Sequence, residues 1–157
     1  MPAPKTRPQA KERYPYPSYN FVVSVTNVDD GTTVSGAFSE VSGLQVEVGA
    51  IEYRDGMDDT TMRKIRGLKK FQNLTFKRGV TGHHGFWDWI KRGMDGDSDR
   101  QLGHIALLDE DRNEVMRWTF ERAWPVKYTG PTFNAKTGEI AMEAVEVAIE
   151  NLDMSLT

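Results

Sequence analysis

Residues 114–121 read EVMRWTFE, and the fold class follows most directly from this stretch. Apolar and polar side chains alternate along it, which places Met116, Trp118 and Phe120 on one face of an extended chain. Such alternation is typical of an antiparallel strand with one face in the core and the other in solvent. It predicts a mainly β protein whose core contains these aromatic side chains.

Further strand patterns surround this stretch. Residues 105–108 precede it across the polar turn 109–113. On the same grounds we expect strands at residues 19–25, 32–41, 46–53, 71–80 and 139–151. In the last of these the apolar residues change parity near Ala144, which predicts a β-bulge. A helix is the alternative for this segment, because it is rich in alanine and glutamate.

One helix and one long loop are expected between the strands. The helix is expected at residues 83–92, where apolar side chains recur at helical spacing and glycines follow. The apolar residues are Phe86, Trp89 and Ile90, and the glycines are Gly93 and Gly96. Residues 54–70 are polar, charged and punctuated by glycine, and they exceed the ~2–5 residues of a hairpin turn. A loop of that length usually has a function.

The bulk composition fits one domain with an N-terminal arm. The chain has 157 residues, 38% of them hydrophobic and 27% charged, so a core can form. Residues 1–18 contain five of the seven prolines, which predicts an extended arm ahead of a single domain at 19–157. We find no secretory signal or membrane-length apolar run, so we expect the protein to be made in the cytoplasm.

No catalytic, cofactor or metal site is recognisable, so we expect no enzyme and no cofactor. The chain has no cysteine, which excludes thiolate chemistry. Residues 95–99 begin like a calcium loop, but Arg100 and Ala106 occupy the places that require glycine and glutamate. His83 and His84 are adjacent, and a helix needs i, i+4 spacing to direct two ligands at one metal.

The basic stretch 63–78 raises a different hypothesis. It contains seven lysines and arginines and no acidic residue, with Phe71 and Phe76 interleaved. Cations with aromatic side chains can bind phosphates and stack on bases, so a nucleic-acid-binding module is one alternative. Asp55, Asp58 and Asp59 lie just upstream, and the net charge of the chain is −3. We therefore favour interface electrostatics over specific nucleic-acid binding.

The order of several short segments carries a resemblance to a known family. They are YNFVV at 19–23, FSEVSGL at 38–44, IEYR at 51–54, LTFKRG at 74–79, FWDW at 86–89, LLD at 107–109 with NEV at 113–115, and AWPVK at 123–127. Across roughly residues 19–152 the chain resembles the tail tube proteins of contractile phages and of extracellular contractile injection systems. It departs from that pattern in its longer proline-rich arm and in the His83-His84 pair.

The resemblance implies a β-barrel-like or sandwich-like antiparallel subunit with one flanking helix. Six copies would form a ring, and rings would stack into a hollow conduit for cargo, in an injection system or, alternatively, for DNA in a phage tail. Such a tube would have a sheath protein and a baseplate or spike hub as partners, within a phage-tail-like particle. Stacked rings need heterologous contacts, and a closed ring removes the open strand edges of a monomer.

The same resemblance suggests where the contacts lie. Residues 54–70 would pack on adjacent subunits, through Arg54, Asp55, Asp58, Asp59, Arg63, Lys64, Arg66, Lys69 and Lys70. Residues 36–53 and 71–80 would line the lumen, with Gln45, Glu47, Gln72 and Lys77 as the candidates that face it. No catalytic residue is implied.

Overall fold

In the residues that the structure describes, the protein is an antiparallel β structure with one helix. We describe it from a computed structural model, which covers residues 15–26, 33–36, 38–57, 60–80, 85–96 and 100–156. In these residues the elements are β1 (Phe21–Thr26), β2 (Thr33–Gly36), β3 (Glu40–Ser42), β4 (Val46–Tyr53), β5 (Arg63–Phe71), β6 (Leu74–Gly79), α1 (Gly85–Met94), β7 (Gln101–Leu108), β8 (Glu114–Thr129), β9 (Met142–Ala148) and β10 (Asn151–Leu156). The expected fold class is confirmed.

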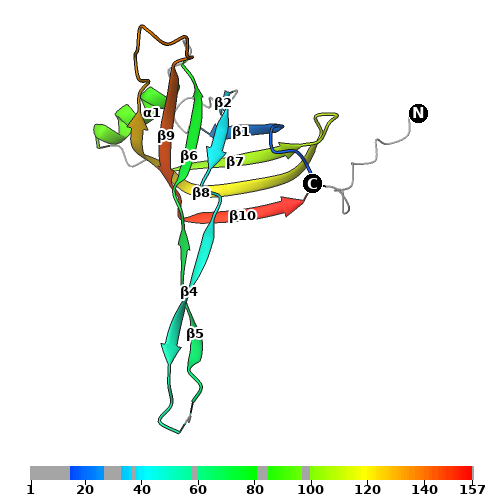
Figure 1. Cartoon of the computed structure of the whole chain (residues 1–157), viewed down its shortest axis with the longest axis vertical. Coiled ribbons are helices and arrows are strands. Elements are labelled where there is room, and N and C mark those ends of the chain that lie inside the picture. Colours follow the sequence, from blue (N-terminus) through cyan, green and yellow to red (C-terminus); the bar gives the residue numbers. More distant parts are fainter. Residues whose placement is uncertain are drawn as a thin grey trace, which may run out of the picture.

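The body of the molecule consists of two crossing layers that share β8. The strand order is β2-β1-β7-β8-β9-β6-β3, with β10 also paired to β8, and every pair is antiparallel. The first half of β8 lies between β7 and β10, whereas its second half pairs with β9. Figure 1 shows β7, β8 and β10 crossing β6 and β9 at a steep angle. One long strand therefore belongs to both layers.

β8 changes layer at Arg122. This residue has a φ of 54°, in the left-handed region that non-glycine residues seldom adopt. The β7–β8 register shifts at the same level, where Gln101 pairs with Ala123 but Gly103 pairs with Phe120. An extra residue in one strand bends it and increases its twist. This bulge is what lets a single strand turn the corner between two layers.

The core lies between the two layers. Phe76 of β6 and Phe120 of β8 meet there with ring centroids 6.0 Å apart, and both are fully buried. Gly103 makes room for this contact, since a Cβ on it would lie 2.4 Å from Cζ of Phe120. Valines of β1 and β9, together with Leu74, Ile105, Trp89, Ala123 and Ile149, complete the cluster. The exposed fraction of Trp118 is intermediate, so its expected place in the core is wrong.

Helix α1 packs on β8 through Trp89, which is 6% exposed. Trp87 meets Tyr128 edge to face at 5.4 Å. The helix runs through Gly93 and ends at Met94, before Gly96 adopts a φ of 90°. Only the second of the two expected stop glycines therefore ends it. His83 and His84 lie outside the described residues, as does part of the 95–99 segment.

The structure corrects several expectations about the strands. Residues 63–70 are not loop, because β5 pairs with β4 along its length. The expected strand 71–80 begins only at Leu74, since Phe71 ends β5. β9 has no bulge at Ala144, because its ladder with β6 is regular from Met142 to Val147; Met142 lies outward at 39% exposed, and the buried Glu143 takes the inward place. Finally, β10 was not expected at all.

Several other expectations are confirmed. Strands form at the expected places in β1, β4 and the first half of β8. Residues 139–151 contain a strand and not a helix. The segment 32–41 holds two short strands, β2 and β3, and β7 starts four residues earlier than expected. Arm residues 1–14 lie outside the described part of the chain.

Candidate assembly interface

The β4–β5 hairpin projects from the body as a separate two-stranded sheet (Figure 1). Its ladder runs from the pair Val46–Phe71 at the base to Tyr53–Arg63 near the tip. The register shifts between Val48–Lys69 and Ala50–Arg66, so β5 contains an extra residue there. Gly67 permits this bulge, because a Cβ on it would lie 2.9 Å from the carbonyl oxygen of Gly49.

Apolar side chains are exposed on both faces of this hairpin. On one face the cross-strand pair Ile51 and Ile65 is 57% and 51% exposed, and on the other face Val46 and Val48 are similarly open. Leu68, in the bulge, is 82% exposed. An isolated two-stranded hairpin is only marginally stable in water, and contiguous exposed apolar surface marks an interaction site. The hairpin therefore has the composition of an interface.

Charge is divided unequally between the two hairpin strands. β5 carries five cations and no acidic residue, whereas β4 carries Glu47 and Glu52. In the register Glu47 faces Lys70 and Glu52 faces Lys64, so opposite charges lie across the ladder. The remaining cations leave the β5 side of the hairpin positive. This asymmetry suits a contact between two different edges, one basic and one acidic.

The predicted contact residues therefore fall into two groups. Arg63, Lys64, Arg66, Lys69 and Lys70 are on β5, not in a loop. Arg54 and Asp55 lie in the connection at the tip, where Asp55 Oδ1 accepts a hydrogen bond from the Met57 backbone N–H at 3.3 Å. Asp58 and Asp59 lie outside the described residues. The structure thus gathers the seven described residues into one hairpin.

The four candidate lumen residues are all exposed. Leu74, Phe76 and Arg78 of β6 point into the body, so Lys77 points outward. Phe71 packs against the core, and Gln72, in the connection between β5 and β6, is exposed. At the hairpin base the Gln45 carbonyl accepts the Gln72 backbone N–H at 3.2 Å, and Glu47 follows on the same face as Gln45.

This outward surface is polar and internally paired. Lys77 Nζ lies 3.6 Å from Oε2 of Glu40, and Asn73 Nδ2 donates to Glu146 Oε1 at 2.9 Å. The first pair joins β6 to β3, and the second joins the residue before β6 to the neighbouring β9. The layer therefore has an apolar inner face and a hydrophilic outer face with charges of both signs.

The structure weakens the nucleic-acid hypothesis for residues 63–78. Phe76 is 1% exposed and cannot stack on a base. Arg78 is also buried, and its Nε lies 2.7 Å from Oε1 of Glu143. Tyr128 donates to the other oxygen of Glu143 at 2.8 Å, and burial followed by this hydrogen bond raises the pKa of Tyr128. Two of the stretch's most important members thus serve the core.

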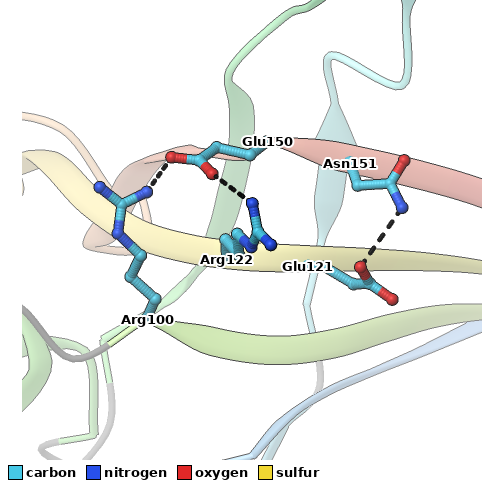
Figure 2. A network of polar contacts seen from close by, with 5 residues as sticks. All are labelled: Arg100, Glu121, Arg122, Glu150 and Asn151. Carbon is cyan, nitrogen blue, oxygen red and sulfur yellow. Dashed lines mark hydrogen bonds and ion pairs between the residues drawn. The ribbon is translucent and has the colours of Figure 1, made fainter.

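A polar network lies at the bend of β8 around Arg122 (Figure 2). Glu150, between β9 and β10, makes ion pairs with Arg100 and with Arg122, the second at 3.2 Å. Beside it Asn151 donates to Glu121 at 3.3 Å. The hydrogen bond from Arg122, and then that from Arg100, lower the pKa of the Glu150 carboxyl. The network joins three chain segments, at Arg100, at residues 121–122 and at residues 150–151. It lies where β8 passes from one layer to the other.

No constellation for catalysis is visible in the described residues. They contain no group of three potential metal ligands and no helix with the length and apolarity of a membrane span. A groove of ≈ 470 Å³ lies between α1 and β8, lined largely by Trp89, Trp124, Pro125 and Val126 with Arg92 and Arg100. Burial and the nearby Arg117 lower the pKa of His104, which lies between Ser24 of β1 and Thr119 of β8 in the ladder.

Comparisons with known proteins agree with an assembly role. Residues 17–153 match the family model described as T4-like virus tail tube protein gp19. No curated protein sequence matches the chain.

Solved structures match over nearly the whole chain. A chain of the extracellular contractile injection system PVC sheath–tube complex in the extended state is 29% identical, with a TM-score of 0.81, over 93% of this chain and 95% of that one. A chain of the anti-feeding prophage cap, which terminates the tube, is 26% identical, with a TM-score of 0.80, over 98% and 99%. A chain of the six-fold symmetrised anti-feeding prophage baseplate has a TM-score of 0.83 at 20% identity, over 90% and 96%, and shows the shared fold.

Proposed function

The chain belongs to the T4-like virus tail tube protein family, and from that premise we propose that six copies form a ring and that rings stack into the inner tube of an extracellular contractile injection system. Family membership makes the protein a structural tube subunit and not an enzyme. The single observation that carries the assembly proposal is the β4–β5 hairpin. It exposes apolar side chains on both faces and has one strongly basic strand.

Ring closure would satisfy the strand edges that one subunit leaves open. Among the described strands, β2 and β3 end the main ladder, and β4 and β5 pair only with each other. Open edges promote uncontrolled association unless another strand covers them. Docking of the basic β5 side against an acidic edge of the next copy covers such an edge and fixes the order of subunits around the ring. The six-fold symmetrisation of the related baseplate supports six copies.

The hydrophilic side of the β3-β6-β9 layer is the proposed lumen wall. Lys77 lies on this side with the Lys77–Glu40 and Asn73–Glu146 pairs, and we place the exposed residues Gln45, Glu47 and Gln72 at the same wall. A wall of this kind neither attracts nor repels a translocated cargo strongly, which favours passage over retention. Charge reversal of Lys77 is accordingly expected to alter cargo loading without altering ring formation.

The proposed partners follow from the related particles. The matched structures are a sheath–tube complex, a baseplate and a tube-terminating cap. We infer that this chain associates with a sheath around the tube and with baseplate and cap proteins at its two ends. Its place is then inside an extracellular phage-tail-like particle after assembly in the producing cell.

Electron microscopy of the purified chain tests the proposal. Six-fold rings and stacked tubes are expected, and a dispersed monomer at high concentration would refute it. The double variant Ile51→Ser/Ile65→Ser is expected to abolish rings and tubes while leaving the circular dichroism of the body unchanged. Leu102→Ser, on β7 and equally exposed at 51%, is the matched control and is expected to assemble.

The other components of the native particle distinguish an injection system from the alternative, a phage tail. A tail tube of a contractile phage would be found attached to a DNA-filled capsid, whereas an injection system carries protein cargo and no head. Purification of native particles through a tagged copy of this chain distinguishes them. Capsid protein and packaged DNA in that preparation would overturn the injection-system assignment while leaving the tube assignment in place.

A further inference from the structure

The groove between α1 and the second half of β8 is largely apolar, and the described residues of the subunit leave it uncovered. Trp89, Trp124 and Met94 line it, and their exposed fractions are 6%, 42% and 64%. Its volume of ≈ 470 Å³ lies within the range of about 300–1,000 Å³ that is usual for ligand pockets. Exposed apolar side chains gathered in a concave site of this size indicate a docking surface.

The groove also holds a hydrogen-bond donor that lacks an acceptor. The indole Nε1–H of Trp89 is buried, and it has no acceptor in the part of the chain that the structure describes. Gln101, which follows the groove residue Arg100, is 2% exposed, and both polar atoms of its side chain are likewise without partners among the described residues. Buried tryptophan N–H groups and side-chain amides normally have partners. A segment docked in the groove would supply Trp89 with a carbonyl acceptor.

The first fourteen residues of the chain, MPAPKTRPQAKERY, have the chemistry that such a groove recognises. Pro2, Pro4 and Pro8 favour the polyproline II conformation, which has no internal hydrogen bonds and keeps its backbone carbonyls available as acceptors. Grooves lined by aromatic side chains bind proline-rich segments, because such a segment is extended before it binds and loses little conformational entropy. The cations of residues 5–13 are not the recognised feature, because the groove itself is lined by Arg92 and Arg100.

The course of β1 directs this segment away from the groove of its own subunit. Phe21, the first residue of β1, pairs with Leu107 near the end of β7, whereas Gln101 begins β7 beside the groove residue Arg100. At about 3.3 Å per residue, positions 101 and 107 of this strand lie roughly 20 Å apart. β1 runs from Leu107 toward Gly103, so the residues that precede Phe21 enter from the side opposite the groove. Figure 1 shows α1 and the end of β7 on opposite sides of the body.

We propose that the groove of each subunit receives the proline-rich segment 2–8 of a neighbouring copy of this chain in the same ring, and that residues 9–14 cross the boundary between the two subunits. The inference rests on the proposed function, which supplies the second copy. A ring places two different sides of each subunit against its two neighbours, and the arm joins β1 on the side opposite the groove. An extended arm spans about 3.1 Å per residue, or roughly 20 Å over residues 9–14, which suffices for the crossing.

Substitutions on both sides of the contact test it by analytical ultracentrifugation. Pro2→Ser/Pro4→Ser/Pro8→Ser is expected to raise the concentration at which the assembly dissociates by about tenfold, because the apolar contact and the preformed extension are both lost. Trp124→Ser is expected to act equally. Because the two changes remove the same contact, all four substitutions together are expected to add nothing further.

Matched controls separate this contact from charge and from general damage to the subunit. Lys5→Ser/Arg7→Ser/Lys11→Ser removes three cations from the arm and keeps every proline. Trp87→Ser replaces a tryptophan that is 46% exposed, close to the 42% of Trp124, but does not line the groove. Neither control is expected to change the concentration at which the assembly dissociates.

Cross-linking identifies the chains in contact, because the protein has no cysteine of its own. Ala3→Cys in the arm and Met94→Cys in the groove are placed on separate chains and co-assembled. A heterodimer linked between positions 3 and 94 is expected on a non-reducing gel after oxidation, and the double variant is expected to give a ladder of oligomers. Met57→Cys, at the hairpin tip and 92% exposed, replaces Met94→Cys in the control and is expected to give no heterodimer with Ala3→Cys.

Several outcomes would overturn the inference. A link within single chains of the double variant, with none between the co-assembled single variants, would show that the arm folds back onto its own groove. Additive losses from the proline and Trp124 substitutions would show that they act at separate places, and a loss from Trp124→Ser alone would assign the groove to another occupant. Rings that form normally without a link between positions 3 and 94, even with a short bis-maleimide, would refute the contact and leave the proposed function intact. A wild-type chain that forms no rings would instead refute the proposed function.

Discussion

The body and the β4–β5 hairpin use the same kinds of residue for opposite purposes. In the body, Phe120 and Val145 are fully buried by strands of the same chain. In the hairpin, Ile51 and Ile65 form an equally apolar cross-strand pair that stays half exposed on a projecting sheet. Burial of apolar area stabilises whichever state achieves it. The body's apolar residues therefore stabilise the subunit, and we propose that the hairpin's stabilise the assembly.

The same difference holds for charge. Arg78 and Glu143 are buried side by side in the body and satisfied by each other and by Tyr128. The hairpin presents its cations along one strand, with only part of the charge balanced across the ladder. A buried pair contributes to a unique arrangement inside one subunit, whereas a one-sided edge selects a neighbour. Four measurements sharpen or break this division, in an assembly-deficient Ile51→Ser/Ile65→Ser background where subunit stability is measured.

The largest expected loss comes from the centre of the body. Phe120→Ala removes a side chain with no exposed surface, in contact with Phe76. The free energy of unfolding is expected to fall by about 3–5 kcal/mol, because a large buried side chain is lost and a cavity remains. Urea denaturation measures it. A loss similar to that of a surface substitution would show that the two layers do not share a packed core.

The second largest loss in the free energy of unfolding is expected from the buried ion pair of Arg78 and Glu143. Arg78→Met leaves Glu143 buried without its cationic partner, and we expect a loss of about 3 kcal/mol. The double variant Arg78→Met/Glu143→Leu removes the orphaned charge and is expected to recover most of that loss. Additive losses in the double variant would contradict a coupled pair.

The hairpin should barely affect the subunit. Val48→Ala, on a half-exposed site of β4, is expected to change the free energy of unfolding by no more than about 0.5 kcal/mol. In the otherwise wild-type chain the same substitution is expected to raise the concentration at which rings form, as analytical ultracentrifugation would show. A large loss in the dissociated subunit would mean that the hairpin packs on its own body.

The smallest effect should depend on pH. Arg122 and Arg100 lower the pKa of Glu150 in the folded state below 4.5. Its stabilising contribution is therefore complete above the unfolded pKa and is lost as the pH falls through the folded pKa. Glu150→Gln is expected to melt slightly below the parent at neutral pH and together with it well below pH 4.5. Glu139→Gln, exposed but outside this network, is the control; a deficit for Glu150→Gln that persists in acid would contradict the linkage.

Sequence reasoning succeeded where periodicity and burial agree. The alternation in residues 114–121 predicted the start of β8, and the helical spacing around Trp89 predicted α1. It failed at β5, because RKIRGLKKF has neither the alternation nor the apolar content of a strand that packs on a core. It failed in a second way at Trp118, which has the right parity but lies where no layer covers it fully.

The candidate contact residues show the same limit. Their charges indicated an interface, but not that five of them lie on one strand. The exposed apolar residues of the hairpin were missed: Ile65 and Leu68 because attention to charge in a presumed loop overlooked them, and Ile51 because it falls in the expected strand 46–53. What identifies them is the pairing of the eight-residue β4 with the nine-residue β5 beyond the tip, which only tertiary contacts reveal. Alternation of apolar and polar residues alone cannot distinguish a side chain that is buried within its own subunit from one that stays exposed and can contact a neighbouring subunit.

The connection between the hairpin and the body has a mechanical consequence. Only Gln72 and Asn73 separate β5 from β6, and the backbone hydrogen bond from Gln72 to Gln45 clamps the two hairpin strands where they leave the body. Gly43 adopts a φ of 95° at this place, where a Cβ would lie 2.2 Å from the Asn73 carbonyl oxygen. Axial force on the tip thus travels along nearly continuous extended backbone into the β6–β9 ladder, as shear across its hydrogen bonds. A column of such subunits would transmit a thrust along its length with little bending at the joint.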